Sequence, residues 1–166
     1  MSVIRPATRH DVPAILQMIH ELAIYEKEPD AVGNTPEKLT DVLFGANPSV
    51  FATMAENAAG EVQGFALWFL NYSTWEGVHG IYLEDLYVRP DARGEGHGKA
   101  LLKHLAGTAV ENGYARVEWS VLDWNEPSIN FYRSLGARLM DGWSMFRLTG
   151  DALAHFGTST VAGVRG

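Results

Sequence analysis

Arg93-Gly94-Glu95-Gly96-His97-Gly98 separates a strand-like segment, Tyr82–Arg89, from a helix-like segment, Lys99–Asn112. A glycine-rich turn that enters a helix leaves several backbone N–H groups without partners and directs them at one point. Together with the positive end of the helix dipole, these donors predict an anion-binding site. Three alternating glycines weaken the start of the helix by up to ~1 kcal/mol each, which indicates close approach of the backbone to a ligand.

The spacing of this loop excludes the two most familiar nucleotide motifs. A phosphate-binding P-loop needs glycine five residues before Gly98 and Ser or Thr after Lys99, but the chain has Arg93 and Ala100 at those positions. The dinucleotide-binding fingerprint needs a third glycine where Lys99 stands. What remains is the pattern Arg-x-x-Gly-x-Gly after an apolar strand.

Length and composition indicate one domain with a sizeable core. The chain has 166 residues, of which 46% are hydrophobic, and no cysteine, so disulfides, thiolate–metal sites and a cysteine nucleophile are excluded. The longest apolar run, Phe65–Leu70, is too short to cross a bilayer, and residues 1–5 lack the layout of a signal peptide. A net charge of −7 argues against general nucleic-acid binding. We therefore expect a cytoplasmic protein with neither nucleic acid nor membrane as a partner.

Hydrophobic periodicity predicts strands and helices in alternation. Strands are expected at Val3–Pro6, Ser49–Ala55, Val62–Tyr72, Gly80–Val88, Ala115–Leu122, Arg138–Met140 and Met145–Leu148. Helices are expected after Asp11 as the N-cap, over residues 35–44, and at Lys99–Asn112 and Glu126–Leu135. This order predicts a mixed sheet with helices on both faces.

A second motif, Leu-Asp-Trp-Asn-Glu-Pro-Ser-Ile-Asn-Phe-Tyr, occupies residues 122–132. Asn125 is placed to cap a helix, Pro127 falls in its first turn, and Tyr132 follows about two turns later. With the glycine loop, this motif resembles the Gcn5-related N-acetyltransferase (GNAT) superfamily. The resemblance implies an α/β fold with a mixed, mostly antiparallel central sheet, helices on both faces and a splayed strand pair for the cofactor. We expect one N-acetyltransferase domain over residues 1–156 and a frayed tail over 157–166.

Within the superfamily, the chain is most similar to the diamine and polyamine acetyltransferases, which include the spermidine/spermine and thialysine types. Three stretches carry this similarity: Glu21–Glu26, Tyr82–Val88 and residues 123–132. Trp119-Ser120 and Asp30–Thr40 depart from the pattern of the polyamine enzymes, so the amine substrate stays open. The resemblance also implies a homodimer.

The resemblance implies acetyl-CoA as the acyl donor, with the diphosphate of coenzyme A on the glycine loop. The acyl–pantetheine arm would lie in the cleft of the splayed pair, where its amides would bond to exposed strand backbone. The residues assigned to the donor are Leu86, Tyr87, Val88, Arg93, Gly94, Glu95, Gly96, His97, Gly98, Lys99, Asn125, Pro127 and Ser128. No metal is expected, because His97 and His104 share a helix face without a third ligand at suitable spacing.

Acetyl transfer to an alkyl amine requires the neutral amine, and its deprotonation at pH 7 costs about 4.6 kcal/mol. By resemblance, Glu84 is the base that shares this cost, although it can also serve only to orient the ammonium group. Asp85, the next residue, should point to the other face of the strand. Backbone N–H groups of Leu86–Val88 would stabilise the oxyanion, and Tyr132 would protonate the departing thiolate.

The predicted amine site combines acidic and aromatic residues. Tyr25 and Glu26 resemble the family's substrate-contacting pair, and Asp141 is expected to close the site near a dimer partner. The residues assigned to the substrate are Tyr25, Glu26, Glu84, Trp119 and Asp141. The leading hypothesis is N-acetylation of a polyamine, a diamine or a lysine- or thialysine-like amino acid. The alternatives are a protein, peptide or aminoglycoside-type acetyltransferase and a non-catalytic acyl-CoA-binding module.

Overall fold

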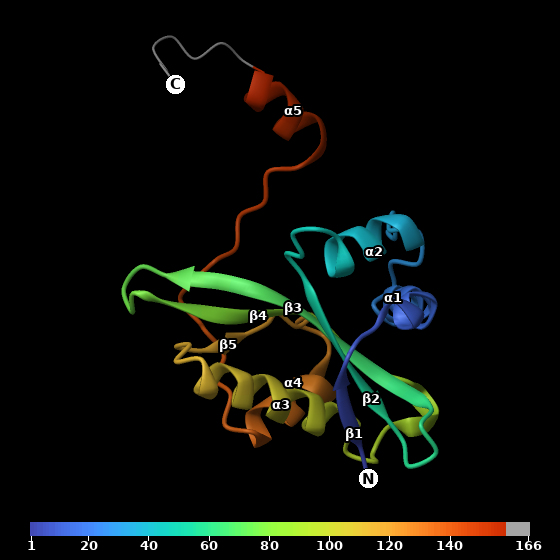
Figure 1. Cartoon of the computed structure of the whole chain (residues 1–166). Coiled ribbons are helices and arrows are strands. Elements are labelled where there is room, and N and C mark those ends of the chain that lie inside the picture. Colours follow the sequence, from blue (N-terminus) through green and yellow to red (C-terminus); the bar gives the residue numbers. More distant parts are fainter. Residues whose placement is uncertain (159–166) are drawn as a thin grey trace. The chain divides into compact units, whose positions relative to one another are not determined.

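The computed structural model describes residues 1–158 (Figure 1). The chain divides into two compact units. The first unit runs from Met1 to Trp124 and the second begins at Asn125. The first unit contains the sheet, three α-helices and the glycine loop, and the second contains the Asn-Glu-Pro-Ser motif. The expectation of one domain over residues 1–156 stays a prediction.

The first unit is built on a five-stranded mixed sheet in the order β1-β2-β3-β4-β5. The strands are β1 (Val3–Pro6), β2 (Phe51–Glu56), β3 (Val62–Ser73), β4 (Val78–Val88) and β5 (Val117–Glu118). The first four are antiparallel neighbours, and β5 runs parallel to β4. The predicted mixed and mostly antiparallel sheet is therefore confirmed.

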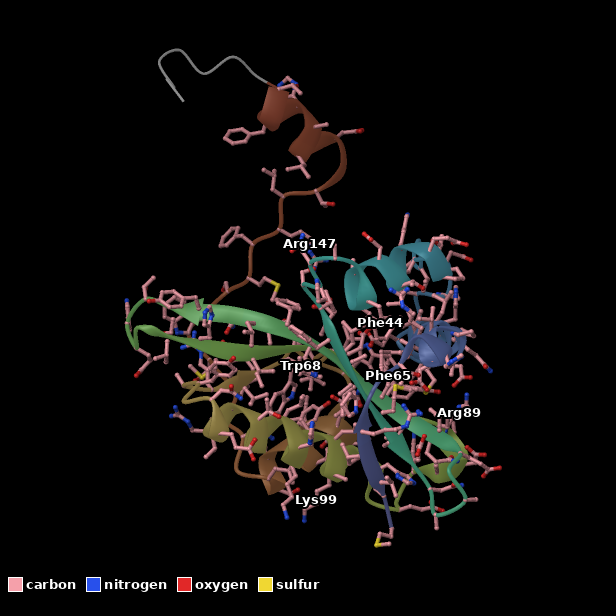
Figure 2. The ribbon with its side chains drawn as sticks, in the orientation of Figure 1. Phe44, Phe65, Trp68, Arg89, Lys99 and Arg147 are labelled. Atoms are coloured by element: carbon pink, nitrogen blue, oxygen red, sulfur yellow. The ribbon has the colours of Figure 1, made fainter. Side chains whose placement is uncertain are left out.

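Helices cover both faces of this sheet, as Figure 1 shows. On one face, α1 (Val12–Tyr25) and α2 (Pro36–Phe44) pack on alternate residues of β2 and β3. Phe65, fully buried in β3 and labelled in Figure 2, is part of this core. On the other face, α3 (His97–Glu111) buries the apolar stripe Leu101, Leu102, Leu105 and Ala109. Since the stripe recurs at helical spacing, the helix packs with one side only.

Three local predictions need correction in the first unit. Asp11 is the N-cap residue of α1 as predicted, but its side chain makes no capping bond; it accepts hydrogen bonds from the Thr8 N–H at 2.7 Å and from the Arg5 guanidinium at 2.8 Å. The helix after the glycine loop begins at His97 rather than at residue 99. The strand predicted at Ala115–Leu122 is reduced to β5, because only Val117 and Glu118 find strand partners on β4.

The second unit contains α4 (Glu126–Ser134) and α5 (Gly150–Thr158). Helix α4 is close to its prediction, with the Asn125 side chain accepting a bond from the Ser128 N–H at 3.4 Å. The strands predicted at Arg138–Met140 and Met145–Leu148 are wrong: in the described chain both segments are irregular. Apolar alternation supplies one face of a strand, but a strand also needs a neighbour that completes its backbone hydrogen bonds.

The predicted tail is only partly described. Gly157 and Thr158 form the end of α5, a helix that the sequence patterns did not predict. Fraying of the tail stays a prediction. The remainder of the predicted tail, residues 159–166, lies outside the described residues.

Candidate active site

The glycine loop presents backbone rather than side chains at the start of α3. Gly94 and Gly96 have φ angles of +87° and +89°, a left-handed conformation that side-chain-bearing residues rarely adopt. A Cβ at either position would meet no atom within 4 Å, so the φ angle and not a shortage of space calls for glycine. No described side chain caps α3, and its first-turn N–H groups at residues 97–99 therefore have no partner within the helix. This geometry supports the predicted anion site.

The edge of β4 that leads into the loop is open on one side. Pairing with β5 is confined to Ile81 with Val117 and Tyr82 with Glu118, whereas β4 continues to Val88. Among the described residues, no strand pairs with this edge beyond Tyr82. A strand pair joined at one end only is the splayed arrangement that the family resemblance implies, and its open edge contains the predicted donor residues Leu86, Tyr87 and Val88. Unpaired strand backbone can receive an extended ligand as an added strand.

Arg93 connects the loop to the end of α1. Its Nε donates a hydrogen bond to the Val88 carbonyl at 3.0 Å. Its guanidinium carbon lies 5.2 Å from the centre of the Tyr25 ring and 5.6 Å from that of Tyr87, within range for cation–π attraction. The Tyr25 ring lies 5.9 Å from the Trp124 ring. A predicted amine-site residue, Tyr25, is therefore brought beside a predicted donor residue.

A β-bulge changes the faces to which the carboxylates of β4 belong. Leu67 pairs with Asp85 while the next residue, Trp68, pairs with Leu83, so Glu84 is an extra residue without a partner on β3. Residues paired across a sheet share a face. Asp85 therefore lies on the face of Leu67, which packs against α1 and α2. Glu84 is exposed and Asp85 is half-buried.

The environment of Asp85 favours its neutral form. Burial, followed by the charges of Glu84 and Glu26, raises the pKa of Asp85 to about 6. Burial also raises the pKa of Glu26, which directly follows α1. Three carboxyl groups from two elements thus share one electrostatic environment. Such a group attracts a cationic ligand, and a carboxylate that titrates near neutral pH suits general base catalysis.

Asp85 is a candidate functional residue that the sequence patterns did not assign to the site. Simple alternation along a strand places Asp85 on the same face as Leu83, whereas the bulge places the two residues on opposite faces. The apolar residues of 82–88 do not mark the bulge, since Leu83 and Leu86 flank the acidic pair Glu84-Asp85. The signal in the sequence for a second carboxylate in the site was the adjacent acidic pair itself.

His97, assigned to the donor, directs its side chain into the protein. The residue is 2% exposed, and its Nδ1 lies 2.7 Å from the Ser2 Oγ. Its Nε2 lies 3.2 Å from a carboxylate oxygen of Glu95. The imidazole is therefore a structural anchor, and the group of His97 that is available to the predicted anion site is its backbone N–H in the first turn of α3. The neighbouring Lys99, labelled in Figure 2, is exposed on α3.

The remaining site predictions divide between the two units. Trp119 follows β5 and is half-buried in the first unit. Tyr132 lies on α4, where its ring centre is 5.6 Å from that of Phe131, and Asp141 lies in an exposed turn after that helix. Pro127 occupies the first turn of α4. For these residues of the second unit, a place in the site stays a prediction.

Within the described residues, no group of three or more His, Asp or Glu side chains is arranged to hold a metal ion. In the same part of the chain, no helix combines the length and apolar character needed to span a membrane.

The glycine loop and the splayed strands agree with a known protein family. The model of the Acetyltransferase (GNAT) family matches residues 15–137, which include the loop, β4 and α4. The chain belongs to this family. The acetyltransferase is 42% identical over 161 residues to the thialysine N-epsilon-acetyltransferase of Sus scrofa, and the match covers 91% of this chain and 94% of that protein.

Two further comparisons bear on activity and fold. The acetyltransferase is 33% identical over 196 residues to the L-ornithine N5-acetyltransferase NATA1 of Arabidopsis thaliana, covering 92% of this chain and 86% of the relative. A solved integron cassette protein from the mobile metagenome of V. cholerae superimposes with a TM-score of 0.79 at 26% identity, over 95% of this chain and 98% of that one. The chain is an N-acetyltransferase, and the predicted similarity to the thialysine type is confirmed.

Proposed function

We propose that this N-acetyltransferase transfers an acetyl group from acetyl-CoA to a primary amine of a small cationic substrate. The substrate class is a polyamine, a diamine or a lysine- or thialysine-like amino acid. The observation that carries this proposal is the carboxyl cluster of Glu26, Glu84 and Asp85, which Tyr25 and Arg93 link to the glycine loop. The named substrates of two relatives, thialysine and L-ornithine, each carry a side-chain amine and support the same class.

The donor is proposed to use backbone groups for most of its contacts. The diphosphate of coenzyme A would accept hydrogen bonds from N–H groups of residues 94–99, at the positive end of the α3 dipole. The pantetheine arm would pair with the open edge of β4 beyond Tyr82. Backbone N–H groups of Leu86–Val88 would then stabilise the oxyanion that forms on the thioester carbonyl.

The reaction is a direct transfer within a ternary complex. A carboxylate accepts a proton from the ammonium group, the neutral amine attacks the thioester carbonyl, and collapse of the intermediate expels the coenzyme A thiolate. By family resemblance, Tyr132 protonates that thiolate. Two carboxylates compete for the role of base: Glu84 by resemblance, and Asp85 because its pKa is raised to about 6, close to neutral pH.

Thiol release in the presence of different amines tests the proposed activity. The protein is incubated with acetyl-CoA and a panel containing spermidine, a short diamine, lysine, ornithine and thialysine. We expect amine-dependent formation of free thiol and of the N-acetylated product. Acetylation of peptides or aminoglycosides alone would contradict the proposed substrate class. Tight donor binding without transfer to any amine would indicate a binding module instead.

The pH dependence of kcat/KM distinguishes the two candidate bases. If Asp85 accepts the proton, its ionisation produces a rise in kcat/KM with a midpoint near pH 6, and Asp85→Asn removes this rise. If Glu84 accepts it, Glu84→Gln causes the larger loss of kcat. Because the carboxyl groups interact, the midpoint belongs to the cluster, and both variants are needed for the assignment.

We also propose that the enzyme is a homodimer, as its resemblance to the diamine acetyltransferases implies. Size-exclusion chromatography with light scattering measures its mass directly. A mass equal to that of one chain, 18.3 kDa, at micromolar concentration would contradict this proposal.

A further inference from the structure

His97 differs from the rest of the glycine loop in its burial. Of residues 93–99, all within the described part of the chain, only His97 is buried, and its side chain is among the largest fully buried ones. Burial of a polar ring costs free energy unless its nitrogens are hydrogen-bonded. Both ring nitrogens have partners, Ser2 and Glu95.

The two partners of His97 constrain the ring to different degrees. An ionised Glu95 can only accept, so the hydrogen is assigned to Nε2, and Nδ1 accepts from the Ser2 hydroxyl at 2.7 Å. The Glu95 side chain is 60% exposed, so water competes with the 3.2 Å contact. The shorter, partly buried bond to Ser2 is the stronger constraint.

Ser2 is held in place by the strand that follows it. Strand β1 pairs with β2 in a fixed register, Val3 opposite Glu56, and the Arg5 guanidinium bonds to the carboxylates of both Glu56 and Asp11. The Ser2–His97 bond therefore ties the glycine loop to a fixed strand 95 residues away in sequence. The loop needs such a tether, because glycine at positions 94 and 96 gives its backbone unusual freedom.

We propose that Ser2 and His97 are positioning residues that hold the loop in the conformation that binds the donor's diphosphate. This role presupposes the coenzyme A donor proposed above. A loop already fixed in its binding conformation loses less conformational entropy when the ligand arrives, so the tether lowers the Kd of the donor. The Ser2–His97 bond involves neither the amine nor the thioester, so its loss leaves kcat at saturating donor unchanged.

Matched variants separate the tether from general effects on folding. Ser2→Ala removes the hydroxyl, and His97→Gln keeps a polar atom near Nε2 but none near Nδ1. His97→Asn keeps a polar atom near Nδ1, where it can still bond to Ser2. Thr108→Ala, also in α3, is the control for loss of a hydroxyl, because the Thr108 hydroxyl donates to the His104 carbonyl of its own helix.

Calorimetry with coenzyme A and steady-state kinetics with acetyl-CoA give the required measurements. For Ser2→Ala and His97→Gln we expect the Kd of coenzyme A and the KM of acetyl-CoA to rise about five- to tenfold, the effect of one lost hydrogen bond. His97→Asn and Thr108→Ala should stay within about twofold of the unmodified enzyme. The Ser2→Ala change should leave kcat unchanged, and combining it with His97→Gln should add little further loss.

Three outcomes would overturn the proposal. Donor affinity in Ser2→Ala equal to that of the unmodified enzyme would do so and would leave the proposed function intact. If Ser2→Ala lowers both kcat and the midpoint of unfolding, the residue has a structural role only. If the unmodified enzyme itself fails to bind coenzyme A, the proposed function is wrong and this role with it. Should His97→Gln not fold, Ser2→Ala and His97→Asn still decide.

Discussion

Replacement of Asp85 by asparagine should stabilise the protein at alkaline pH while it impairs the enzyme. Asp85 lies on the face of β4 that packs against α1 and α2, where it is half-buried. Burial, with the charges of Glu84 and Glu26, raises its pKa from 3.8 to about 6. Asparagine has the same shape without the charge, so the substitution removes the repulsion and the desolvation cost but keeps the packing.

The pH range in which Asp85→Asn gains stability follows from the raised pKa of Asp85. Well below pH 3.8 the carboxyl group is neutral in both the folded and the unfolded chain, so it does not lower the stability. As pH rises from 3.8 to about 6, the unfolded chain ionises more readily, so stability falls. Above about pH 6 the full cost remains, about 3 kcal/mol for this displacement of pKa.

Partial exposure of the carboxyl group reduces this cost, so we expect Asp85→Asn to raise the free energy of unfolding by about 2 kcal/mol at pH 8. Near pH 4 the gain should be below about 0.5 kcal/mol, since the carboxyl group of the unfolded chain is then only partly ionised. Urea unfolding at the two pH values measures both quantities. Asp91→Asn, the same change at an exposed position, is the matched control. A gain of equal size at both pH values, or a loss at pH 8, would refute the argument from a desolvated carboxylate.

Three further substitutions test other parts of the site. Tyr132→Phe should lower kcat about 100-fold, the usual scale for a lost general acid, while calorimetry shows the Kd of coenzyme A nearly unchanged. Gly96→Ala should weaken coenzyme A binding about tenfold or more, because alanine at a φ of +89° carries about 1–2 kcal/mol of strain; an unchanged Kd would contradict the assigned loop geometry. Arg93→Gln should raise KM for both the donor and the amine by about three- to tenfold, because it removes the cation–π contact with Tyr25; an effect on the donor alone would show that the link to Tyr25 has no functional weight.

Elements with strong local signals were predictable from the sequence. The stripe of α3 recurs at helical spacing, and the helix predicted over residues 35–44 is α2, whose N-cap residue Thr35 accepts a bond from the Lys38 N–H. The failures share a different cause. The predicted strands at Arg138–Met140 and Met145–Leu148 have suitable side chains, but a strand also depends on a partner strand, which no local pattern specifies. The same dependence limits β5 to the two residues that reach β4.

The candidate site was predictable to a similar extent. The alternating glycines at 94 and 96 predict an anion site lined by backbone. In the structure both residues have the left-handed conformation that only glycine adopts freely. The inward direction of His97 depends on Ser2, a residue from the far end of the first unit's sequence, and no local pattern contains it. The role of Asp85 depends on a register shift between β3 and β4, which is a property of the strand pair.

That register shift explains how one strand serves two purposes. In a regular strand Ile81, Leu83, Asp85 and Tyr87 would all point to the same face, because they alternate with their neighbours. With Glu84 as an extra residue, Ile81 and Leu83 stay on the face that α3 covers, while Asp85 and Tyr87 turn toward α1. The bulge thus keeps the apolar core of α3 intact and delivers a carboxylate to the end of α1. The resulting repulsion between Asp85 and its acidic neighbours opposes folding, and a cationic amine is the ligand that would relieve it.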